Sequence, residues 1–82
     1  MALWTVRADY DPDAHVWYVF DSDVPGLTGE ADSLDTLQAK LGPRILDMIS
    51  GNAHLIADQS RLQGPHEFRL VAHAEARYSI AA

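Results

Sequence analysis

Apolar and polar residues alternate near the start of the chain, from position 4 to position 10. From Leu3 to Tyr10 the even positions carry Trp, Val, Ala and Tyr, whereas the odd positions from 5 onward carry Thr, Arg and Asp. A period of two is typical of a strand with one buried face. The pattern therefore predicts a strand over residues 3–10, with its even face, Tyr10 included, toward the core.

A turn and a second strand follow. Residues 11–14 read Asp-Pro-Asp-Ala and favour a tight turn, because Pro presets φ and Asp side chains bond nearby backbone amides. The next strand is predicted over residues 15–21 and closes a hairpin with the first. Both of its faces are apolar, since two sets alternate along it: Val16, Tyr18 and Phe20 on one side, and Trp17 and Val19 on the other.

A short strand and a helix come next. Residues 23–27, Asp-Val-Pro-Gly-Leu, redirect the chain, and residues 28–31 are long enough for a short third strand. Ser33 is a suitable helix N-cap, and Gly42-Pro43 predicts a kink or a division into two short helices, because an internal Pro costs about 3 kcal/mol. Ser50-Gly51-Asn52 should end the helix. Its apolar stripe recurs at helical spacing: Leu34, Leu37, Leu41, Ile45, Met48 and Ile49.

The remaining chain carries a weaker pattern before alternation returns. Within residues 50–65, Leu55, Ile56 and Leu62 favour a further helical turn. Residues 67–76 alternate again and predict the last strand, with the C-terminal tail 77–82 beyond it.

The order of elements is β-β-β-α-β within a single domain over residues 1–82. A right-handed crossover would bring the last strand beside the first. The sequence therefore predicts an α+β fold: a four-stranded, mostly antiparallel sheet in the order 3-2-1-4, with one kinked helix on one face.

One helix leaves the other face of such a sheet bare. We expect Trp17 and Val19 on this uncovered face, with Asp21 and Asp23 at its rim, as the residues that contact a partner. We expect Leu3 and Val71 on this uncovered face as well. Cover would come from a second chain, or from the segment around Leu55 and Leu62.

Charge and composition narrow the choice of partner. The formal net charge is −6 and the six Lys and Arg residues are scattered, which argues against direct nucleic-acid binding. An acidic surface favours a basic protein partner, although the same charge also serves solubility. The chain has no cysteine, no signal-peptide pattern and no apolar run of membrane-spanning length, so we expect a cytoplasmic protein without membrane contact.

The chemistry-bearing residues form no recognisable catalytic pattern. The four His residues lack metal-binding spacing, and no nucleophile elbow or Gly-rich phosphate loop is present. Asp9, Asp21, Asp23 and Asp32 lie near strand ends, as carboxylates do in ribonuclease-H-like nucleases, but turn, cap and strand-end roles explain them. We expect no catalytic residue, no metal and no cofactor; a small metal-dependent nuclease is the weaker alternative.

Two adjoining segments carry a resemblance to a known family. Tyr18-Val-Phe-Asp-Ser-Asp-Val-Pro-Gly-Leu27 and Glu30-Ala-Asp-Ser-Leu34 resemble HicB-like antitoxin domains, and with the hairpin before them the similarity covers residues 3–49. It is greatest to a short branch described only as a domain of unknown function. Ala31 stands where the family usually has Gly, and no ribbon-helix-helix or helix-turn-helix segment follows, so operator binding by this chain alone is not expected.

The resemblance implies a partial ribonuclease-H-like fold without its catalytic residues. It also implies a role, in which the domain covers a small, basic mRNA interferase toxin and blocks its active site. The alternative is a stand-alone homo-oligomeric domain of the same fold, which associates with itself through the sheet face or a strand edge.

Overall fold

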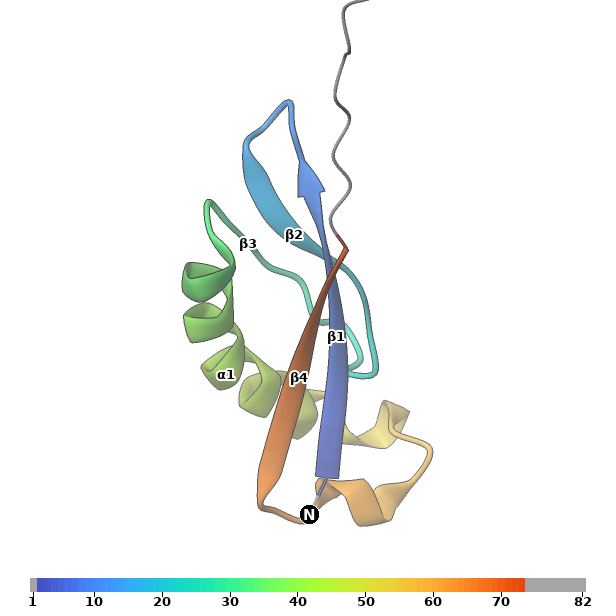
Figure 1. Cartoon of the computed structure of the whole chain (residues 1–82). Coiled ribbons are helices and arrows are strands. Elements are labelled where there is room, and N and C mark those ends of the chain that lie inside the picture. Colours follow the sequence, from blue (N-terminus) through green and yellow to red (C-terminus); the bar gives the residue numbers. More distant parts are fainter. Residues whose placement is uncertain (1, 74–82) are drawn as a thin grey trace, which may run out of the picture.

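A computed structural model describes residues 2–73, which form one sheet and one long helix (Figure 1). The strand order is β3-β2-β1-β4; β4 runs parallel to β1, and the other neighbouring pairs are antiparallel. This α+β arrangement confirms the predicted fold class and strand order. The elements are β1 (Ala2–Asp11), β2 (Val16–Ser22), β3 (Glu30–Ala31), α1 (Leu34–Gly51), the 3₁₀ helices η1 (Ala53–Leu55) and η2 (Gln59–Leu62), and β4 (His66–His73).

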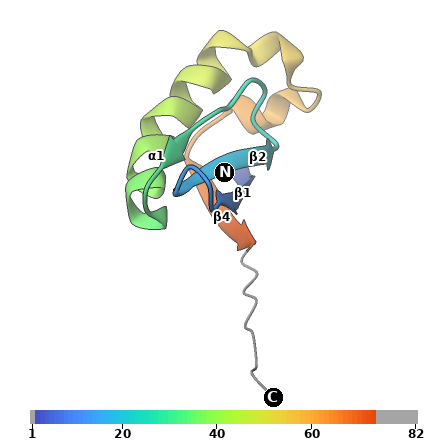
Figure 2. The same cartoon turned by 90° about the horizontal axis from the view of Figure 1, so that it is seen from above.

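Helix α1 begins and ends at the predicted residues. The Ser33 side chain accepts a hydrogen bond from the Thr36 amide at 3.1 Å, which satisfies one free N–H of the first turn. At the other end the Asn52 amide donates to the Met48 carbonyl at 2.9 Å. The helix continues through Pro43 as one element, so the alternative of two short helices is wrong, and its ribbon curves around the sheet in Figure 2.

The core lies between this helix and one face of the sheet. The even positions of β1 from Ala2 to Ala8 are all buried, as the alternation predicts. Tyr10 is the exception at 37% exposure, because it lies at the hairpin end; its ring packs at a tilt against Trp17 there, with ring centroids 5.2 Å apart. The largest completely buried side chains, each worth about 1.5–3 kcal/mol of apolar burial, are Trp4, Val6, Leu37 and Leu41.

The register of the hairpin corrects one prediction. Tyr10 is paired with Trp17, and Ala8 with Val19. Directly paired residues share a face, so Trp17 and Val19 lie on the helix side, where they pack against the core. The expectation that they lie on the uncovered face is wrong. Strand parity could not decide this, because both faces of β2 are apolar; the four-residue loop after Asp11 sets the register.

The shorter elements depart modestly from their predicted bounds. Strand β3 has two paired residues rather than four, although the Val19 amide also bonds to the Gly29 carbonyl at 3.0 Å. Ile56 is buried and Leu62 packs against the core, which confirms helical turns in the weakly patterned segment. Residues 74–76 of the last strand and the tail 77–82 lie outside the described residues. Among residues 2–73 no helix is long and apolar enough to cross a membrane.

Candidate functional site

The side of the sheet opposite α1 is the candidate site, and we call it the open face. Helix α1 packs on one side of the sheet only (Figure 2). Away from the hairpin end, the register assigns a set of side chains to the other side, because they alternate with the buried ones or pair with residues that do. The open face consists of Leu3, Thr5, Arg7 and Asp9 from β1, Tyr18 and Asp21 from β2, Glu30 from β3, and Glu67, Arg69 and Val71 from β4.

Apolar side chains on this face are exposed to solvent. Leu3 is 46% exposed, Val71 39% and Tyr18 36%. Phe20, at 52%, is the extra residue where the register of β2 shifts between Val19 and Asp21. Such a bulge re-aims side chains locally. Leu3 and Val71 therefore lie where the sequence placed them, whereas Tyr18 was assigned to the wrong side of β2.

Polar contacts organise the charged part of the face. Arg7 Nε lies 3.5 Å from Asp21 Oδ2, with both side chains more than half exposed, so this ion pair adds at most about 1 kcal/mol to stability. Arg69 donates to the Thr5 hydroxyl at 3.0 Å. Across the whole face, carboxylates outnumber guanidinium groups. The face is thus a mildly acidic surface with dispersed apolar side chains, suited to a protein with basic residues.

The two predicted rim residues have different positions. Asp21 lies on the open face beside Arg7. Asp23 follows the end of β2 and is tied to the backbone, since its carboxylate accepts the Thr5 amide at 3.1 Å and lies 3.5 Å from Arg61. Asp23 therefore extends the hydrogen bonding along β1 past the end of β2. Asp21 is the more exposed of the two carboxylates.

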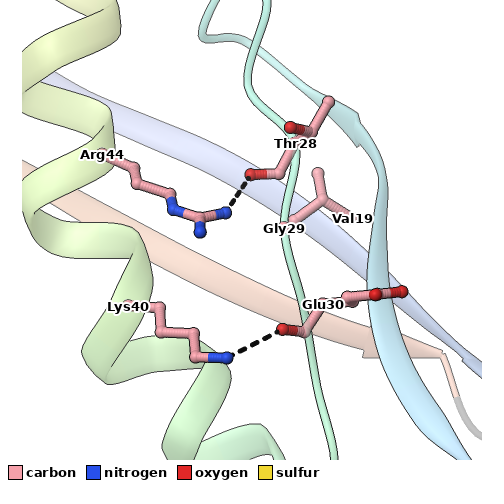
Figure 3. A pocket seen from close by; sticks show the side chains of 6 residues that line it. All are labelled: Val19, Thr28, Gly29, Glu30, Lys40 and Arg44. Carbon is pink, nitrogen blue, oxygen red and sulfur yellow. Dashed lines mark hydrogen bonds between the residues drawn. The ribbon is translucent and has the colours of Figure 1, made fainter.

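A second feature lies at the edge of the sheet between β3 and α1. A cavity of about 510 Å³ is lined by Val19, Thr28, Gly29, Glu30, Lys40 and Arg44 (Figure 3). Arg44 donates to the Thr28 carbonyl at 3.2 Å, and Lys40 to the Glu30 carbonyl at 3.3 Å. The Glu30 carboxylate points away from Lys40 (Figure 3). Both cationic side chains thus hydrogen-bond to backbone carbonyls at the β3 edge and link this edge to α1.

The described residues bring few chemistry-bearing groups together. In residues 2–73, no three His, Asp or Glu side chains converge in a way that could hold a metal ion. Asp9 and Asp21 both lie on the open face, but they are paired with different neighbours, Tyr18 and Arg7 respectively.

Comparisons with known proteins place this fold among relatives. A family model described as a domain of unknown function (DUF1902) matches residues 3–82. A solved structure, the crystal structure of hypothetical protein TTHA1013 from the extremely thermophilic bacterium Thermus thermophilus, is 34% identical, with a TM-score of 0.75. The similarity covers 94% of this chain and 100% of that one. No curated protein matches.

Proposed function

The chain belongs to the DUF1902 family of domains of unknown function, and from the open face of its sheet we propose that it works by binding another protein, without catalysis of its own. The observation that carries the proposal is the exposure of Leu3, Tyr18 and Val71 on a sheet face that the described chain does not cover. Burying such side chains against a partner would remove apolar surface from water at about 25 cal/mol per Å².

The partner we propose is a small, basic mRNA interferase toxin, which the domain neutralises as HicB-like antitoxins do. The resemblance of residues 18–34 to those antitoxins supports this choice. The net charge of −6 and the excess of carboxylates on the open face support it independently, because they would speed the encounter with a basic protein. In this proposal the chain is cytoplasmic and uses no cofactor.

The test begins with the gene neighbourhood. A short reading frame for a basic protein should adjoin this gene, its product should arrest growth when expressed alone, and co-expression of this chain should restore growth. Leu3→Asp and Val71→Asp, which place a desolvated charge in the interface, should weaken the rescue and the copurification of the two proteins. Leu55→Asp is the matched control, since Leu55 is 60% exposed but lies on η1, outside the open face.

Several results would count against the proposal. Absence of any adjoining basic frame, or copurification that Leu3→Asp and Leu55→Asp affect equally, would leave the toxin without support. Self-association of the open face is the second candidate. It predicts that the purified wild-type chain is oligomeric and that Leu3→Asp alone makes it monomeric in sedimentation.

A further inference from the structure

The two edges of the sheet are protected to very different degrees. Strand β3 forms one edge, with two paired residues; Lys40 donates to the carbonyl of its Glu30, and Arg44 to the carbonyl of Thr28 just before it. Strand β4 forms the other edge over eight residues, and within residues 2–73 it pairs with β1 alone. A long unprotected edge is a template for pairing with another strand. The fold therefore offers one edge for extension of the sheet.

The direction of the backbone groups along β4 follows from its contact with β1. The Ala2 amide donates to the Pro65 carbonyl at 3.1 Å. Because backbone groups point to alternate sides along a strand, the odd residues of β4 bond toward β1. The even residues, Phe68 among them, direct their N–H and C=O groups to the free edge.

We propose that two copies of this chain associate by antiparallel pairing of β4 with β4, around a two-fold axis at Phe68, so that their sheets join into one of eight strands. In this register Phe68 of one copy lies opposite Phe68 of the other, and Glu67 of each copy lies opposite Arg69 of the other. The latter are non-hydrogen-bonded pairs, in which Cα atoms are about 4.5 Å apart and side chains lie closest. Two opposite-charge contacts thus repeat by symmetry, which makes the edge complementary to itself.

An apolar hollow beside the same edge supports this second copy as the occupant. A cavity of about 200 Å³ lies between α1 and the start of β4, lined by Gly42, Ile45, Leu46, His66, Glu67 and Phe68. Leu46 is 54% exposed there. Pairing at Phe68 brings the Phe68 ring of each copy next to the hollow of the other copy. Backbone pairing, opposite-charge contacts and burial of apolar side chains would therefore all stabilise the dimer near the proposed two-fold axis.

This dimer engages only the β4 margin of the open face, through Glu67 and Arg69, and leaves Leu3 and Tyr18 exposed. It does not depend on the proposed function. The test is a charge exchange followed by sedimentation at tens of micromolar. Glu67→Arg and Arg69→Glu each replace two attractive contacts by two repulsive ones, and should weaken dimerisation about tenfold or more. The double variant Glu67→Arg/Arg69→Glu restores the pairing and should return to within about threefold of wild type. Asp13→Arg makes the same charge change in the hairpin loop and should leave the dimer intact.

Cysteine pairing gives a second readout that does not rest on charge. The chain has no cysteine of its own, and Cα atoms about 4.5 Å apart suit a disulfide. On oxidation with diamide, a mixture of Glu67→Cys and Arg69→Cys chains should form the mixed disulfide faster than either variant forms its own. A monomeric wild type, a double variant that stays dissociated, or mixed crosslinking no faster than self-crosslinking would each overturn the proposal.

Discussion

At the scale of single residues, Arg61 joins η2 to the end of the sheet. Its guanidinium lies over the Trp4 ring, 4.0 Å from the ring centroid, and donates to the Leu3 carbonyl at 2.7 Å. It also lies 3.5 Å from the Asp23 carboxylate. Strand β2 ends before it reaches Leu3, so one side chain satisfies a strand carbonyl that has lost its neighbour.

We expect Arg61→Ala to lower the free energy of unfolding by about 2 kcal/mol, because a cation–π contact and a charged hydrogen bond are lost together. Urea denaturation followed by tryptophan fluorescence measures the change. Arg7→Ala is the control, since its exposed ion pair with Asp21 should cost about 0.5 kcal/mol or less. Equal losses for the two variants would show that Arg61 contributes no more than a surface charge.

Asp58 is a second residue whose charged side chain forms hydrogen bonds within the fold, here to Ser60 at the start of η2. A hydrogen bond from the Ser60 hydroxyl, and a second from the Ser60 amide at 3.1 Å, lower the pKa of Asp58 below its ordinary value. The ionised form is therefore favoured in the folded chain. The resulting stabilisation is complete above the pKa of the unfolded chain, and it is lost as the pH falls through the lower folded value.

Ser60→Ala removes the hydroxyl donor, so the pKa of Asp58 should rise toward its ordinary value. An NMR titration of the Asp58 carboxyl carbon measures this shift. Ser50→Ala, at an exposed position near the end of α1, should leave the titration unchanged. An unchanged pKa in Ser60→Ala would show that the hydroxyl bond does not hold the carboxylate.

At the scale of elements, α1 owes its continuity to packing rather than to propensity. Pro43 lacks the N–H that would bond to the preceding turn, and Gly42 beside it lowers helix propensity further. Leu41 and Ile45 on either side are nevertheless buried, so the apolar stripe holds the helix together across the weak point. Burial of the stripe outweighs a local cost of about 3 kcal/mol.

Pro43→Ala should therefore stabilise the chain by about 2 kcal/mol, because Pro43 is exposed and its replacement restores a backbone hydrogen bond. Part of the gain is offset, since Ala leaves the unfolded chain more freedom. Thermal unfolding by circular dichroism measures it. Pro12→Ala in the hairpin loop is the comparison and should give no such gain. Loss of stability in Pro43→Ala would mean that the sheet requires the bend at this position.

At the scale of the whole molecule, the decisive fact is which side of the sheet helix α1 covers. Trp17 lies on the covered side and packs at a tilt against Tyr10. Leu3 lies on the bare side at 46% exposure. Within residues 2–73, a single helical layer therefore leaves apolar side chains on the other sheet face exposed to water.

This arrangement predicts opposite outcomes for two truncations. Trp17→Ala should cost about 2–3 kcal/mol of stability, through lost packing and the lost aromatic contact. Leu3→Ala should cost about 0.5 kcal/mol and act mainly on binding. Chemical denaturation of both variants, read by circular dichroism, compares them. A Trp17→Ala chain as stable as wild type would contradict the core role of Trp17 and would favour a role in partner binding instead.

The sequence by itself determined the order of elements, the strand order of the sheet, the buried face of β1 and the ends of α1. Alternation, helical spacing and a capping serine are local signals, and each of them survives in the fold. Only the tertiary structure decided which face of β2 is covered, because both faces are apolar and the hairpin register chooses between them. It also decided the place of Arg61 and the contrast between the two sheet edges, since both depend on residues far apart in the chain.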